Sequence, residues 1–356
     1  MNILHLHITD DQSFPIQSLE YPELTQKGSF GPDFVYSKEN MSSVLQYAFD
    51  RGVIIVPEFD MPAHASSWGA GKPDSVVTGY PGCSPTLFTH GDTLDPTKNE
   101  TYDMIRTLLS EMVENIFDDT KTPYLHLGGD EVPTSCWLSS DHVVSWMKDR
   151  GYNDTSELES YFVNRVANEF YNESSTNSSN KILMYWEEVF NNGCELRKDA
   201  IIQAWKSNVM PDVLKSGRRV TNSYKWYLNH GPNNYGDGLW NDFYVNDPMK
   251  WVGGDLFHLE NLVLGGETTM WSEKVDAVSF DSVVWPRTSA AAEQLWSPTN
   301  YTNSTSLNIT ALSRRLAEHR CRMVRRGVRS SPLNDMDDAL CMIHLYAALP
   351  ASHTIS

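Results

Sequence analysis

Two adjacent acids close a strand-like segment, YLHLGGDEVP, at residues 124–133. Asp130 and Glu131 follow a glycine pair, Gly128 and Gly129. Successive residues of a straight strand point to opposite faces, so both carboxylates can enter one cavity only where the backbone bends, which glycine permits. Two close carboxylates resist ionising together, so we expect one raised pKa and a proton donor beside a charged acid. The alternative is a helix cap or loop pair without chemistry.

Tryptophans stand at or just beyond three further strand-like segments, at Trp186, Trp205 and Trp271. Aromatic faces stack on the apolar faces of sugar rings, and carboxylates or imidazoles nearby can bind hydroxyl groups. A single tryptophan more often belongs to a core. Three of them at strand ends indicate a carbohydrate site.

The elements that must position these residues alternate between short apolar segments and longer helical patterns. This alternation is typical of βα units and a parallel sheet. Strands are expected at residues 3–8, 53–58, 124–127, 182–186, 201–205, 219–223 and 262–266. Helices are expected at residues 42–51, 102–116, 158–171, 212–215 and 306–326.

Nearly every expected strand ends in residues that could do chemistry. Beyond the acids and tryptophans above, these residues are His5, His7, Asp10, Glu58, Asp60, Glu187, Tyr224, Trp226 and Glu267. In a (β/α)8 barrel the catalytic groups collect at the carboxyl ends of the strands, whereas an open doubly wound sheet gathers them at one switch point. The predicted fold class is therefore α/β, a TIM-type barrel. Only seven strands are found, so we expect an incomplete barrel that lacks its first strand.

Composition excludes several classes of function. A net charge of −18 argues against a nucleic-acid partner, and we interpret the arginines of residues 314–329 as a solvated helix face. No apolar run is long enough for a membrane span. Asn-x-Ser/Thr sequons, such as those at Asn153 and Asn172, favour the secretory route, although a tripeptide this permissive also occurs by chance. The strand pattern begins directly after Met1, so no signal peptide is expected in this chain.

The motifs in chain order resemble glycoside hydrolase family 20, in particular the animal lysosomal type of β-N-acetylhexosaminidase. They are HLHITDDQSFP, PEFDMPAH, HLGGDEV, YWEEVF, QAW, WYLN, MWSE and WPRTSAAAEQLWS. The resemblance implies a catalytic barrel domain over residues 1–341, with strands two to eight and a terminal helix, and leaves residues 342–356 as a divergent tail. The small α/β domain that precedes the barrel in this family is expected to be absent.

The resemblance also implies a mechanism that needs neither a cofactor nor a metal. Glu131 resembles the general acid that protonates the glycosidic oxygen and later activates water. Asp130 resembles the carboxylate that orients the substrate's 2-acetamido group, whose carbonyl oxygen attacks the anomeric carbon. Tyr227 is expected to hydrogen-bond that acetamide, and retention of anomeric configuration is implied.

Further positions match binding and supporting residues of the family. The expected walls of the acetamide pocket are the three tryptophans, and Glu273 is expected to bind ring hydroxyls. The support network around the acid is expected to contain His64, Asp60, His7 and Asp10. Asn229 and His230 follow Tyr227, and we expect this pair to tolerate anionic substrates at acid pH, when the imidazole is charged.

The cysteines contain no CxxC pair, so metal binding through sulfur is not expected. The family resemblance pairs Cys83 with Cys136 and Cys321 with Cys341. It leaves Cys194 as a free thiol.

The implied function is hydrolysis of terminal non-reducing N-acetyl-β-D-hexosamine residues from oligosaccharides or glycoconjugates. The implied setting is a lysosomal or secreted glycoprotein that forms a homodimer or heterodimer. The family carries a substrate-binding Arg before the HLHITDD motif, and this chain starts after that position. One alternative is therefore a vestigial sugar-binding barrel without turnover. Another is a metal-dependent amidohydrolase, because His5 and His7 share a strand face.

Overall fold

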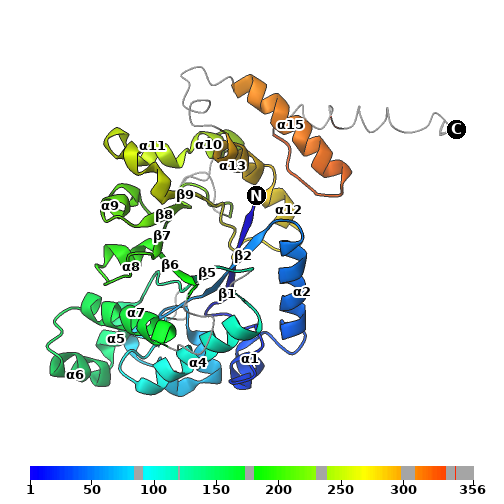
Figure 1. Ribbon diagram of the computed structural model, residues 1–356. Helices are drawn as coiled ribbons and strands as arrows, with labels where there is room; N and C mark the ends of the chain where they lie inside the picture. The colour runs from blue at the N-terminus through cyan, green and yellow to red at the C-terminus, as the bar shows by residue number, and fades with distance from the viewer. Residues whose placement is uncertain are drawn as a thin grey trace. The chain divides into compact units, whose positions relative to one another are not determined.

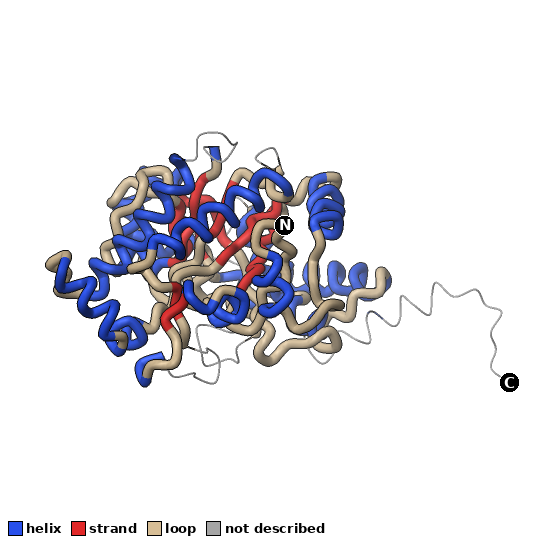
Figure 2. Tube along the Cα trace, turned by 90° about the horizontal axis from the view of Figure 1, so that it is seen from below, coloured by secondary structure: helices blue, strands red, loops and turns tan. Residues whose placement is uncertain are grey.

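The structure, a computed structural model, describes residues 1–83, 91–118, 121–172, 180–229, 239–297 and 309–333, together with Cys341. The chain divides into two compact units. The first comprises Met1–Gln203 and Ser216–Arg219, and the second comprises Ala204–Lys215 and Val220–Ser356. Figure 2 shows the strands in red, with helices in blue around them.

Parallel strands run through the first unit in chain order. They are β1 (Ile3–Thr9), β2 (Ile54–Phe59), β5 (Tyr124–His126), β6 (Ile182–Trp186) and β7 (Ile201–Ala204). The helices of this unit are α1 (Pro22–Gly28), α2 (Lys38–Phe49), α3 (Ser66–Gly71), α4 (Asn99–Asn115), α5 (Thr134–Ser139), α6 (Asp141–Asp149), α7 (Thr155–Asn172) and α8 (Glu187–Asn191). Helices α2, α4 and α7 flank the strands (Figure 1).

The register of these strands places polar side chains in one row. His7 pairs with Glu58 across β1 and β2, and Glu58 pairs with His126 across β2 and β5. Trp186 then pairs with Gln203 across β6 and β7. Because residues two apart share a face of a strand, His5 lies on the same face as His7. Glu58, His126 and Gln203 are fully buried, so this face of the sheet has a polar interior.

A side-chain cap fixes the start of α2. The Ser37 hydroxyl accepts a hydrogen bond from the Asn40 backbone N–H at 3.2 Å, and the Asn40 side-chain oxygen accepts one from the Ser37 N–H at 3.1 Å. This reciprocal cap satisfies two N–H groups that a helix start otherwise leaves unpaired. It explains why α2 begins at Lys38, before the start that we expected at residue 42.

A small antiparallel sheet and a disulfide support the segment after the strand β5. Strands β3 (Val76–Val77) and β4 (Thr93–Leu94) pair with each other. The short helix η1 (Pro73–Ser75) precedes β3, and the short helix η2 (Pro81–Cys83) lies between the two strands in the chain. The predicted disulfide between Cys83 and Cys136 joins η2 to α5 and is confirmed. The neighbouring Trp137 is fully buried in the same apolar cluster. Cys194 is a free, buried thiol, as expected.

The second unit contains the parallel strands β8 (Arg219–Asn222) and β9 (Val263–Gly266), in chain order. Its helices are α9 (Met210–Lys215), α10 (Trp240–Val245), α11 (Pro248–Val252), η4 (Gly254–Leu262), α12 (Phe280–Val284), α13 (Arg287–Trp296) and α15 (Ile309–Arg325). Its core forms around Trp226, whose indole N–H donates to the Phe243 carbonyl at 2.9 Å. The predicted disulfide between Cys321 and Cys341 is confirmed.

The seven expected strands and the helices expected beside them are confirmed, with boundaries that differ by a few residues. The βα alternation and the parallel direction of the strands agree with the predicted barrel class. The sequence patterns did not predict the small β3–β4 sheet, because its strands have two residues each. The proposed tail, residues 342–356, lies outside the described residues. Among the described helices, none has the length and hydrophobicity that crossing a bilayer requires.

Candidate active site

The strand tip that carries the two acids is bent, as the glycine pair predicted. Gly128 and Gly129 have φ angles of 67° and 98°, which side-chain-bearing residues rarely adopt. A Cβ atom on Gly128 would lie 1.7 Å from Asp60 Oδ1, so only glycine fits beside that carboxylate. The Gly129 N–H donates to the same oxygen at 3.1 Å. Glu131 also has a left-handed φ, of 52°, a strained conformation that clusters at functional sites.

The bend places the two acids in different environments. Asp130 is 7% exposed, whereas the side chain of Glu131 is 43% exposed. Burial raises the pKa of Asp130 to about 6, and the nearby acids Glu188 and Glu58 add to this against the opposing charge of His64. Glu131 is the carboxyl group that a ligand can reach from solvent.

One expectation about these acids needs correction. We expected the adjacent carboxylate, Glu131, to raise the pKa of its neighbour through repulsion. The raised pKa of Asp130 instead has burial as its largest cause, because the bend turns Glu131 toward solvent. The acid that interacts directly with Asp130 is Asp60. The pKa of Asp60 is raised well above its usual range by burial and by the charge of Asp130.

His64 links the acids to the first strand. Its Nδ1 lies 3.1 Å from Asp10 Oδ1, and its Nε2 lies 3.7 Å from Asp130 Oδ2 and 3.9 Å from Glu131 Oε2. Burial alone would lower the pKa of His64, but the hydrogen bond to Asp10 and the charges of Asp60 and Asp130 outweigh it and raise that pKa well above its usual range. The imidazolium is therefore a positive charge beside both acids of the strand tip.

Asp10 connects His64 to His7 on the strand β1. His7 Nε2 lies 3.2 Å from Asp10 Oδ2, and its Nδ1 lies 2.7 Å from Glu58 Oε2. Burial alone would raise the pKa of Asp10, but its hydrogen bonds to the two imidazoles hold that pKa well below its usual range. The residues predicted as a support network, Asp10, His7, His64 and Asp60, are therefore brought together with Asp130 and Glu131 in the first unit.

Glu58 is a central residue that our site prediction omitted. This fully buried carboxylate lies 3.0 Å from His5 Nε2 and 3.2 Å from His126 Nδ1, in addition to its contact with His7. Its Oε1 accepts a hydrogen bond from the Trp186 indole N–H at 2.8 Å. The charges of the three histidines outweigh burial and hold the pKa of Glu58 well below its usual range. Its place at the end of the expected strand 53–58, two residues before Asp60, was the sequence signal that could have included it.

Trp186 is 1% exposed in the structure. Its ring lies among the imidazoles of His126 and His5, at centroid distances of 5.0 and 5.8 Å. The indole is therefore held by Glu58 in a fixed orientation, at the end of β6 and on the face of the sheet that carries the acids. A side chain this rigid can form the floor of a pocket at low entropic cost.

Four of the predicted residues of the second unit form two pairs. Trp205 and Tyr227 are buried, with ring centroids 5.7 Å apart. The Asn229 side-chain amide donates to Glu273 Oε2 at 3.2 Å. Trp271 is partly buried on the same chain segment as Glu273. His230 lies outside the described residues.

Several of these acids and histidines have the spacing that a metal ion could bridge. The donor atoms of His5, Glu58 and His126 lie within 4.8 Å of one another, as do those of Asp60, His64 and Asp130. In both groups a carboxylate already faces an imidazole within the protein. His126 Nδ1 lies 3.0 Å from the Gly128 nitrogen and 3.2 Å from Glu58 Oε1, so this ring nitrogen already has partners within the protein.

Comparison with known proteins assigns these features to one family. Residues 1–299 match the family described as glycosyl hydrolase family 20, catalytic domain. The chain is similar to beta-hexosaminidase subunit alpha of Mus musculus, with 37% identity over 344 residues that cover 94% of this chain and 60% of that protein. It is also similar to beta-hexosaminidase subunit A1 of Dictyostelium discoideum, with 33% identity over 338 residues that cover 93% and 59%. The chain thus spans about 60% of the length of the curated relatives that it matches.

Solved structures show the same fold. A chitobiase of Flavobacterium johnsoniae has a TM-score of 0.76 and 28% identity, over 96% of this chain and 49% of that chain. The exo-β-N-acetylglucosaminidase of Vibrio harveyi, solved in complex with N-acetylglucosamine, has a TM-score of 0.77 over 94% of this chain and 54% of that chain. Its 22% identity supports a likeness of fold alone. The predicted α/β barrel class is confirmed.

Proposed function

Because this chain belongs to glycoside hydrolase family 20, we propose that it removes terminal non-reducing N-acetyl-β-D-hexosamine residues from oligosaccharides or glycoconjugates. The observation that carries the proposal is the bent strand tip, where the exposed Glu131 stands beside the buried Asp130 and both face the His64 imidazole. A glycosidase needs a proton donor that reaches the leaving oxygen and a second group that stabilises charge at the anomeric carbon. Membership of a glycosidase family also favours this function over the amidohydrolase alternative.

In the proposed mechanism, Glu131 gives its proton to the glycosidic oxygen as the bond to the anomeric carbon breaks. The substrate's acetamido oxygen attacks that carbon from the opposite face, which gives a cyclic oxazolinium ion. Glu131 then takes a proton from water as the water opens the ring, and the β configuration is retained. No carboxylate of the enzyme forms a bond to the sugar.

Asp130 is proposed to accept a hydrogen bond from the acetamide N–H. This role requires the ionised form of Asp130. Its pKa of about 6 in the free protein means that the carboxyl group is only partly ionised at mildly acidic pH. An N–H donor from the substrate favours the ionised form. Asp60 and His64 are proposed to hold Asp130 and Glu131 in place and to balance their charge.

The residues of the second unit are assigned roles from their motifs. Tyr227 is proposed to hydrogen-bond the acetamide carbonyl, and Glu273 is proposed to bind ring hydroxyls while Asn229 holds its other oxygen. The acetamide group is proposed to be enclosed by Trp186, Trp205 and Trp271. The ring contact between Trp205 and Tyr227 supports this part of the proposal, because an ordered aromatic pair suits a small acyl group.

The natural setting is proposed from the relatives. Pairing with a second subunit agrees with the names of the curated relatives, which are hexosaminidase subunits alpha and beta. A lysosomal or secreted location is proposed from the Asn-x-Ser/Thr sequons. We also propose that Asn229 and His230 tolerate a sulfate or carboxylate on the substrate. Equal ratios of 6-sulfated to neutral substrate hydrolysis in the wild type and in His230→Leu would contradict this proposal.

A chromogenic N-acetylglucosaminide at about pH 5 tests the proposed function directly. We expect turnover by the wild type and a decrease in kcat of about 10²- to 10⁴-fold in Glu131→Gln, because the variant cannot donate the proton. Glu114→Gln, at an exposed site on α4, is the matched control and should keep full activity. Tight binding of an oxazoline-like inhibitor without any turnover would instead support the vestigial sugar-binding barrel.

A further inference from the structure

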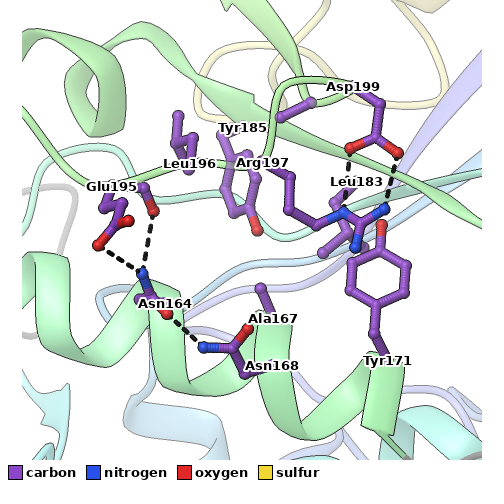
Figure 3. A pocket seen from close by; sticks show the side chains of 11 residues that line it. Asn164, Ala167, Asn168, Tyr171, Leu183, Tyr185, Glu195, Leu196, Arg197 and Asp199 are labelled. Carbon is purple, nitrogen blue, oxygen red and sulfur yellow. Dashed lines mark hydrogen bonds and ion pairs between the residues drawn. The ribbon is translucent and has the colours of Figure 1, made fainter.

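A cavity of about 290 Å³ opens between helix α7, strand β6 and the segment that precedes β7 (Figure 3). Leu183 and Tyr185 line it from β6. Alternate residues of a strand point to opposite faces, and Trp186 points toward Glu58, so Tyr185 points away from the acids. The cavity therefore lies on the other face of the sheet from the proposed catalytic residues.

The hydroxyl of Tyr185 faces this cavity (Figure 3). The residue is 3% exposed, and within the described part of the chain no group forms a hydrogen bond with its hydroxyl. Burial raises the pKa of Tyr185 well above its usual range, so the hydroxyl stays protonated and can both donate and accept. Because this hydroxyl opens to the cavity, a polar group of a ligand at this point can take the place of solvent as its hydrogen-bond partner.

The charged groups around the cavity are already paired with protein partners. Arg197 donates from Nε and Nη2 to the two oxygens of Asp199 at 3.0 and 3.1 Å, and its guanidinium stacks on the Tyr171 ring at 4.0 Å. The Asn164 amide donates to Glu195 Oε2 at 3.3 Å. The Glu195 carboxylate, which among the described residues has only this neutral partner, leaves one net negative charge at the rim and so disfavours an anion.

Hydrogen-bonding atoms remain available around the same space. Asn168 donates to Asn164 through Nδ2, which leaves the Asn168 carbonyl oxygen for another partner. Arg197 keeps Nη1 beyond its pair of bonds to Asp199. Together with the Tyr185 hydroxyl, these planar groups suit neighbouring hydroxyls of a ligand, and the side chains of Ala167 and Leu183 supply an apolar surface for a C–H face.

We propose that this cavity binds one neutral pyranose ring, as a sugar-binding site separate from the catalytic one. Its volume is close to the lower end of the range for small-molecule sites, about 300 Å³, which suits a single ring rather than an oligosaccharide. The site does not rest on the proposed hydrolysis, because no catalytic residue lines it. It provides a second point at which a glycan can be held by the first unit.

Fluorine NMR of the full chain tests this site. The chain is labelled with 3-fluorotyrosine and carries the substitution Glu131→Gln, which prevents turnover. The Tyr185 signal is assigned with Tyr185→Phe. We expect a saturable shift of this signal with N-acetylglucosamine and with glucose, and none with glycerol or acetate. Tyr161, which does not line the cavity, serves as the internal control. The Tyr227 signal reports the proposed catalytic site separately, so failure of one site leaves the other measurable.

Two variants locate the binding. Ala167→Trp fills the cavity and should abolish the saturable shift of Tyr185, with the fold checked by circular dichroism. Asn168→Ala, at an exposed position that tolerates change, should weaken binding by about fivefold through loss of one hydrogen bond. The proposal would be overturned by a Tyr185 signal that never shifts or that responds to acetate as it does to sugar. It would also be overturned if both variants bound the sugar as tightly as the wild type does.

Discussion

The acids of the strand tip show how neighbouring residues acquire different chemistry. Asp130 and Glu131 have the same functional group, yet one is buried against Asp60 and the other is open to solvent. The difference arises from the backbone, because Gly128 and Gly129 turn the chain between the strand and the acids. Burial, rather than the adjacent charge, then sets the pKa of Asp130.

Glu58 is expected to control the charge of His7. Burial alone lowers the pKa of His7, and the Glu58 carboxylate is the largest influence that raises it. Glu58→Gln keeps the shape of the side chain and an oxygen for the Trp186 N–H, but it removes the charge. We therefore expect the pKa of His7 to fall, as measured by NMR titration of the histidine rings, and the free energy of unfolding to fall by about 3–5 kcal/mol.

Trp186→Phe is the matched control for this prediction. It removes the indole N–H bond to Glu58 and leaves the charge in place. The pKa of His7 should stay raised in this variant, with a smaller loss of stability, about 1.5–3 kcal/mol. An unchanged pKa of His7 in Glu58→Gln would show that the carboxylate does not have the electrostatic role assigned to it.

At the scale of elements, the bend after β5 depends on one close approach of backbone to side chain. A methyl group on Gly128 would overlap Asp60 Oδ1, whereas one on Gly151 would meet nothing within 4 Å. Both glycines have positive φ angles, 67° and 72°, so Gly151→Ala controls for the backbone strain alone. We expect Gly151→Ala to cost about 1–2 kcal/mol and Gly128→Ala to cost more than about 4 kcal/mol in urea unfolding. Equal losses would mean that the contact with Asp60 is not decisive.

The sequence predicted the strands well and the site only in part. Strand ends could be read from apolar runs followed by His, Asp, Glu or Trp, because parallel strands bring their carboxyl ends to the same edge. The sequence motifs also predicted a shared site for Asp10, His64, Asp130 and Glu131, and the structure brings these four residues together. The contacts around Glu58 could not be derived in this way, because they depend on the register between strands that are far apart in the chain. The start of α2 and the strands β3 and β4 were not predicted either. A side-chain cap sets the first, and two residues are too few to show an alternating pattern.

At the scale of the whole molecule, the shifted groups favour acidic conditions. His7 and His64 have raised pKa values, so their contribution to stability is complete below the unfolded pKa of about 6.5 and is lost as pH rises through their folded values. Asp10 and Glu58 have lowered pKa values, so their contribution is complete above about pH 4.5. Between about pH 4.5 and about pH 6.5, the stabilising contributions of all four groups are therefore complete. A net charge of −18 also repels itself less when carboxylates begin to protonate.

We therefore expect a higher melting temperature at about pH 5 than at about pH 8, measured by scanning calorimetry. The raised pKa of Asp130, about 6, acts in the same direction, because the folded state holds its proton beyond the pH at which the unfolded state has lost it. His64→Asn should reduce the difference between the two melting temperatures. A protein that melts at a higher temperature at about pH 8 would contradict this assignment of charges.

The most direct test of the central claim uses chromogenic glycosides whose acetamido methyl group is increasingly fluorinated. Fluorine withdraws electrons from the amide oxygen, which the proposed mechanism uses as the nucleophile while Glu131 protonates the leaving oxygen. The account predicts that kcat/KM falls steeply with each added fluorine. A rate that does not depend on fluorination would contradict it, because the nucleophile would then be a group other than the substrate's own amide.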